Sequence, residues 1–81
     1  MPPSEVYEVE DETVVEIEVL SGKRYQGEFS LLLGKSSGKR DPQMDRVKID
    51  NAVEMPNGKK INGAVEVWAK DIKNSKFVYN A

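Results

Sequence analysis

Apolar and polar residues alternate along the N-terminal part of the chain. From Tyr7 to Val19 the odd positions are mostly apolar, whereas most of the even positions are glutamate. A period of two predicts an extended chain, because successive side chains of a strand point to opposite faces of a sheet. Asp11 interrupts the apolar row. We therefore expect an extended, acidic lead-in over residues 1–12 and a first full strand over residues 13–20.

A short helix capped by Ser4 is the alternative for the lead-in. Serine is a favourable residue at the start of a helix. However, Val6, Tyr7 and Val9 do not make a full helical stripe over the short stretch available. The extended interpretation is preferred for this reason.

Four more strands follow, separated by turn-forming residues. Ser21 and Gly22 supply a turn into the second strand, which predicts an antiparallel hairpin. Gly27 lies inside that strand, where a glycine indicates a bend or the close approach of another backbone. Turn signals at residues 56–58 and 62–63 predict a short hairpin extension. The strands predicted after the first span residues 25–31, 47–53, 64–70 and 77–79, with a tight turn at 73–76.

A basic loop at residues 34–46 interrupts the strands. Residues 34–43 contain turn formers and charges without a periodic apolar pattern, which predicts a mobile loop carrying Lys35, Lys39 and Arg40. Its glycines suggest a phosphate-binding loop at first sight. That motif needs four residues between its glycines and a Ser or Thr after the Lys, whereas this chain has three residues there and an Arg after the Lys.

Length and composition favour one small β-rich domain. A chain of 81 residues is long enough for a single domain, which we assign to residues 13–81. Valine occurs ten times and leucine four times, and β-branched side chains fit a pleated surface. Because so small a domain buries a limited share of its surface, it gains from a partner subunit. Self-association is therefore expected.

The sequence contains neither cysteine nor histidine. Disulfides and thiolate metal sites are therefore excluded, and the commonest catalytic base and metal ligand is absent. The acidic residues also lack the spacing of a calcium loop. We expect a protein that is not an enzyme and holds no cofactor or metal. Without a long apolar run or a signal-peptide pattern, we also expect it to be soluble, outside the membrane and cytoplasmic.

The net charge of −2 conceals a strong asymmetry. Residues 1–22 carry seven acids and no base, whereas residues 23–81 carry all twelve Lys and Arg against seven acids. Such runs are usually solvated surface. The alternative is a basic surface that binds a polyanion, with the acidic edge pointing elsewhere.

Five features occur in a distinctive order along the chain. An alternating strand ends in a glycine turn, a second strand has a central glycine, a loop reads Asp-Pro-Gln-Met-Asp, a third strand ends in an acid, and Ile-Lys-Asn precedes a short apolar strand. This order resembles the Sm/LSm family of RNA-binding ring proteins, which includes the Hfq-like members. The five features lie at residues 15–22, 25–29, 41–45, 47–54 and 72–79.

The resemblance implies an all-β fold, a small and strongly bent five-stranded antiparallel barrel of the SH3 type. It implies a homo-oligomeric ring in which the fourth strand, near Trp68, pairs with the fifth strand, near Val78, of the next copy. Such a ring would bind single-stranded RNA or DNA and act in nucleic-acid processing. The alternatives are a structural or adaptor ring without nucleic-acid binding, and a barrel that binds protein partners through an edge strand.

By position, the resemblance places Gln43 against a base and Asp45 at the edge of that base. Lys73 and Asn74 would close the other side, and Met44 is either a base contact or a core residue. Basic residues of the loop would meet phosphates. The predicted nucleic-acid-binding residues are Lys35, Lys39, Arg40, Gln43, Met44, Asp45, Arg46, Lys73 and Asn74.

Two of these positions depart from the family pattern. Asp45 stands where Asn is usual, and an ionised carboxylate can only accept hydrogen bonds. Lys73 stands where Arg is usual and lacks the flat guanidinium that stacks on a base. We therefore expect binding that is more electrostatic and less base-selective. In plainer alternatives, Gln43 and Asp45 are ordinary loop residues, Lys73 and Asn74 form a turn, and Trp68 is an interface or core residue.

Overall fold

The computed structural model describes residues 4–78, and most of this part is antiparallel β-sheet. Three short 3-10 helices are η1 (Ser4–Glu8), η2 (Pro42–Met44) and η3 (Ala69–Asp71). The β-rich antiparallel expectation is confirmed, but the predicted number of strands is wrong, because eight are present and three of them have two residues each. The strands are β1 (Val14–Val19), β2 (Arg24–Leu32), β3 (Lys35–Ser36), β4 (Lys39–Arg40), β5 (Arg46–Met55), β6 (Lys59–Lys60), β7 (Val65–Trp68) and β8 (Ile72–Phe77).

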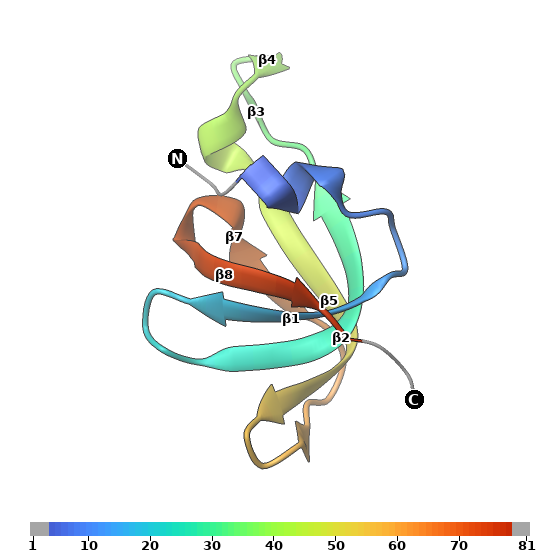
Figure 1. The fold of residues 1–81 in the computed structure, drawn as a ribbon. Helices are drawn as coiled ribbons and strands as arrows, with labels where there is room; N and C mark the ends of the chain where they lie inside the picture. Colours follow the sequence, from blue (N-terminus) through green and yellow to red (C-terminus); the bar gives the residue numbers. More distant parts are fainter. Residues whose placement is uncertain (1–3, 79–81) are drawn as a thin grey trace.

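Six strands form one sheet in the order β6-β5-β2-β1-β8, and β7 also pairs with β5. Figure 1 shows β2 curving from its place beside β1 to its place beside β5. The predicted hairpin extension is confirmed by the pairing of β6 with the end of β5. Within residues 4–78, β7 and β8 do not pair with each other, so this sheet does not close on itself and keeps a free edge on each of these strands.

The bend of β2 lies at a glycine. The register between β2 and β5 shifts between Gln26 and Glu28. A Cβ atom built on the intervening Gly27 would lie 2.5 Å from the carbonyl oxygen of Asp50 and 2.5 Å from Cγ2 of Ile49. The close backbone approach expected at Gly27 is thus confirmed, because no larger side chain fits between the strands.

Replacing Gly27 with alanine should lower the free energy of unfolding by about 1–3 kcal/mol, because the added methyl group overpacks the contact with β5. Urea denaturation followed by circular dichroism measures the change. Ser30→Ala, at a half-buried position of the same strand, is the control and should cost less. An unchanged midpoint for Gly27→Ala would contradict the close approach of β2 and β5.

The core lies between the curved strands and extends to η1. The inward orientation expected for Val15, Ile17 and Val19 is confirmed. The prediction of an extended lead-in was wrong, because Ser4–Glu8 forms η1 and Val6 is fully buried. The buried apolar residues are Val6, Val15, Ile17, Val19, Phe29, Val47, Ile49, Ala52, Ala69 and Ile72. The N-terminal segment therefore packs as part of the same body.

The C-terminal strands differ from their predicted bounds. The fourth predicted strand ends at Trp68, and η3 provides the turn. Residues 73–76 are strand rather than turn, because β8 runs beside β1 and its polar side chains face the glutamates there. Lys76 Nζ lies 3.4 Å from Glu16 Oε2, for example. Tyr79, in the predicted last strand, lies outside the described residues.

No helix within residues 4–78 is long and apolar enough to cross a membrane.

Candidate nucleic-acid interface

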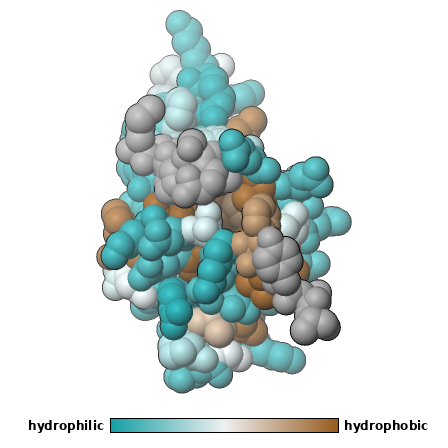
Figure 2. Space-filling model, viewed as in Figure 1, coloured by the Kyte–Doolittle hydropathy of each residue, from teal (hydrophilic) through white to brown (hydrophobic). Residues whose placement is uncertain are grey.

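The predicted mobile loop contains a short hairpin, which we call the basic hairpin (residues 35–40). Lys35 lies opposite Arg40, and Ser36 lies opposite Lys39. Ser37 and its neighbouring glycine have positive φ angles of 52° and 77°, as a two-residue type I′ turn requires. Figure 1 shows the hairpin projecting from one end of the molecule, and Figure 2 shows that this end is hydrophilic on the face in view.

Asp45 is fully buried at the base of the basic hairpin. Its Oδ1 accepts hydrogen bonds from the backbone nitrogen of Gly34 at 2.7 Å and from Nη1 of Arg40 at 2.7 Å. Its Oδ2 accepts from Nη2 of Arg40 at 2.8 Å and from the hydroxyl of Tyr7 at 2.5 Å. We call these four residues the Asp45 cluster. Both carboxylate oxygens are therefore occupied by groups of the chain itself.

The charges in this cluster support one another. Burial alone would raise the pKa of Asp45, but the hydrogen bonds from Arg40, Tyr7 and Gly34 outweigh burial and hold that pKa below its ordinary value. Burial raises the pKa of the Tyr7 hydroxyl, and the hydrogen bond to the carboxylate raises it further. Asp45 is thus ionised and Tyr7 protonated at neutral pH.

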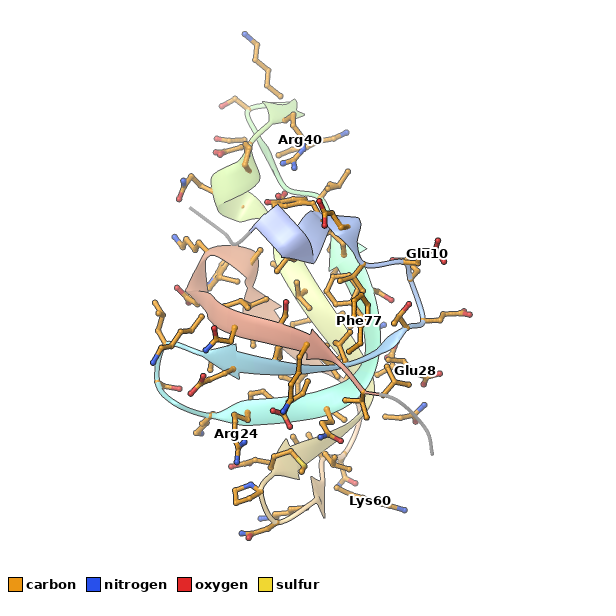
Figure 3. The ribbon with its side chains drawn as sticks, viewed as in Figure 1. Glu10, Arg24, Glu28, Arg40, Lys60 and Phe77 are labelled. Atoms are coloured by element: carbon orange, nitrogen blue, oxygen red, sulfur yellow. The ribbon has the colours of Figure 1, made fainter. Side chains whose placement is uncertain are left out.

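The predicted contact of Asp45 with a nucleic-acid base would require a rearrangement of this cluster. No surface of Asp45 is exposed, and a base would have to displace Arg40 or Tyr7 from its oxygens. Arg40 belongs to the basic hairpin and is partly exposed there (Figure 3). Its guanidinium, however, is bound in bidentate fashion to Asp45. Its charge is therefore largely compensated before any phosphate arrives.

Gln43 and Met44 lie on η2, directly after the basic hairpin, and both are exposed. The side chain of Met44 is 41% exposed, so the alternative of a core residue is wrong. Asp41 caps η2 by accepting a hydrogen bond from the nitrogen of Gln43 at 3.0 Å. Gly34 packs so tightly against the backbone of Met44 that an added Cβ would overlap it. Gln43 and Met44 are thus presented to solvent by a fixed turn.

The remaining predicted residues are more dispersed. Arg46 Nη1 lies 2.8 Å from Glu66 Oε1, in an exposed ion pair between β5 and β7. Lys73 is exposed and follows η3, which packs against η2. Asn74 donates to Glu18 Oε1 at 2.9 Å, on the acidic outer side of β1. Lys73, in β8 close after η3, therefore remains a candidate, whereas Asn74 is engaged with Glu18.

Sequence reasoning missed two members of the Asp45 cluster. Tyr7 was interpreted as part of the alternating lead-in, although the spacing of three between Val6 and Val9 suits a 3-10 helix. Gly34 was treated as a loop former, whereas its backbone N–H donates a hydrogen bond to the carboxylate of Asp45. The sequence signals that could have indicated η1 were Ser4 at its start and the spacing of Val6 and Val9.

Within residues 4–78, no group of three or more acidic side chains is placed to hold a metal ion. The sequence matches no protein-family model, and no curated protein matches it significantly.

Proposed function

We propose that this chain is an Sm-like protein that self-assembles into a ring and binds single-stranded nucleic acid. The observation that carries the assembly is the pair of free sheet edges on β7 and β8. Free edges expose unpaired backbone groups, and pairing β7 of one copy with β8 of the next satisfies them on both sides. In a closed ring every β7 edge and every β8 edge is paired, so the sheet does not extend indefinitely.

Exposed aromatic side chains support this use of the edges. Trp68 at the end of β7 is 40% exposed, and Phe77 at the end of β8 is 51% exposed. Figure 3 shows Phe77 at the C-terminal end of β8. Leu20, 67% exposed, lines the same hollow as Trp68 between the β1–β2 turn and β7. Large apolar side chains in such places favour contact with another protein surface.

Binding of a single strand is supported by the cations left available around η2. Among the described side chains, neither Lys35 nor Lys39 takes part in an ion pair. Both are exposed on the basic hairpin, next to the exposed Gln43 and Met44. Lysines without a partner bind phosphates with little base selectivity. A ring would repeat this weak site around its circumference and strengthen binding through avidity.

The double substitution K35A/K39A should weaken binding to oligo(U), oligo(A) and mixed single-stranded DNA. The slope of log K against log salt is negative and becomes shallower by about 0.7 for each lost phosphate contact, so the pair should make it shallower by about 1.4. Fluorescence anisotropy at about 50 and about 200 mM salt measures both affinity and slope. Lys73→Ala should act in the same direction with a smaller effect.

K59A/K60A is the matched control, because it removes two exposed lysines from the hairpin extension at the other end of the molecule (Figure 3). It should change affinity little. Equal losses in the two double variants would mean that binding depends on net charge and not on the basic hairpin.

A structural or adaptor ring without nucleic-acid binding is the second candidate. It is favoured by the burial of Asp45 and by the bond of Asn74 to Glu18, because both residues are already engaged within the chain. The same titration separates the two functions. Binding that is undetectable at low salt, in a protein whose solution mass is that of an oligomer, would support the structural ring.

A further inference from the structure

We propose that the Asp45 cluster couples the N-terminal helix η1 to the basic hairpin. In this role Asp45 is a positioning residue, which holds Lys35 and Lys39 in place for a bound strand without touching that strand. The effect on binding rests on the proposed function, whereas the coupling itself does not. A change at the N-terminal segment would then alter the nucleic-acid site from a distance.

Three elements of the chain meet at Asp45. Tyr7 of η1 reaches Asp45 across 38 positions of sequence, and Arg40 of β4 and Gly34 reach the same carboxylate from the two ends of the hairpin. The backbone oxygen of Asp45 also accepts from the nitrogen of Ala69 in η3 at 2.9 Å. One buried residue therefore joins η1, the basic hairpin and η3 at the start of β5.

The basic hairpin is too short to fix its own orientation. Its two strands have two residues each and form a sheet separate from the main one. An isolated two-stranded hairpin is at best marginally stable in water. The hydrogen bonds from Gly34 and Arg40 to a buried carboxylate attach both of its ends to the body. The orientation of Lys35 and Lys39 thus depends on Asp45.

The Asp45 carboxylate is surrounded by hydrogen-bond donors. Every side-chain or backbone group that faces the Asp45 carboxylate is a donor: the Tyr7 hydroxyl, two guanidinium N–H groups of Arg40 and the Gly34 N–H. A protonated carboxyl group would itself need to donate and would break this set. The ionised form is required, in agreement with the lowered pKa of Asp45.

The experiment uses Tyr7→Phe in the full chain, which removes one hydroxyl and retains the ring. Hydrogen exchange of the Gly34 amide should accelerate by about tenfold, because its acceptor loses a supporting contact. Affinity for oligo(U) should fall by about threefold with the salt slope unchanged, because Lys35 and Lys39 keep their charges. Tyr25→Phe, in β2, is the control and should change neither quantity.

The outcomes separate the coupling from the proposed function. Unchanged Gly34 exchange in Tyr7→Phe would overturn the coupling, whether or not the protein binds RNA. Faster exchange with unchanged affinity would overturn the positioning role. Faster exchange in a protein that never binds oligonucleotides would support the coupling and refute the proposed function.

A second measurement needs no variant. In the unaltered protein, the amide signal of Gly34 and the ring signals of Tyr7 should shift together on acidification, with a common midpoint below the ordinary Asp pKa of about 3.9. Independent midpoints for the two residues would overturn the coupling.

Discussion

Asp45→Ala is expected to lower the free energy of unfolding by about 3 kcal/mol, at the lower end of the range for breaking a buried ion pair. The substitution leaves the Gly34 N–H and the Arg40 guanidinium without their acceptor. Arg40 is partly exposed and can regain water, which limits the loss. Urea denaturation at pH 7, followed by circular dichroism, measures the change.

The neighbouring acid Asp41 provides the control. Asp41→Ala removes the cap of η2 and should cost about 1 kcal/mol. Because the folded-state pKa of Asp45 is lowered, its stabilisation is complete above the unfolded value of about 3.9 and is lost as pH falls through the folded value. The difference between Asp45→Ala and the unaltered protein should therefore shrink in acid. If Asp45→Ala and Asp41→Ala lowered the free energy of unfolding equally at pH 7, the buried Asp45 cluster would be contradicted.

Glu66→Pro is expected to convert the proposed ring into monomers of 9.1 kDa. The nitrogen of Ala69, directly after β7, donates to the oxygen of Asp45, directly before β5. Donors alternate between the two sides of an antiparallel strand, so the N–H of Glu66 points away from β5, toward the free edge. A proline there removes a donor from the free edge and none from the β5 ladder. Size-exclusion chromatography with light scattering measures the mass.

Glu66→Ala separates the backbone from the side chain. It removes the ion pair with Arg46 but keeps the N–H at the free edge, so it should remain assembled. Urea denaturation should show that the proline variant is still folded. An oligomer that persists in Glu66→Pro would exclude β7 from the interface, and an unaltered protein that is already monomeric would refute the ring.

Strands with a buried face could be predicted from sequence. β1 was recognised because the alternation of Val15, Ile17 and Val19 with glutamates reflects an apolar face that packs into the core. Gly27 was interpreted correctly, because few reasons other than a bend or a close contact place a glycine inside a strand. β8 could not be predicted, because its polar residues form a strand by pairing with β1, whose glutamates lie opposite them. Local composition there resembles a turn.

Part of the candidate site could likewise be predicted from the sequence, and part of it could not. The sequence by itself determined a β-rich domain, the bend at Gly27 and a basic segment carrying Lys35 and Lys39, because periodicity and charge are local properties of a chain. Only the tertiary structure decided that Asp45 is buried, that Arg40 binds it, and that Tyr7 meets both from η1. A carboxylate is buried away from water only where several hydrogen-bond donors contact it. In this chain those donors come from segments up to 38 positions away, which no local pattern reveals.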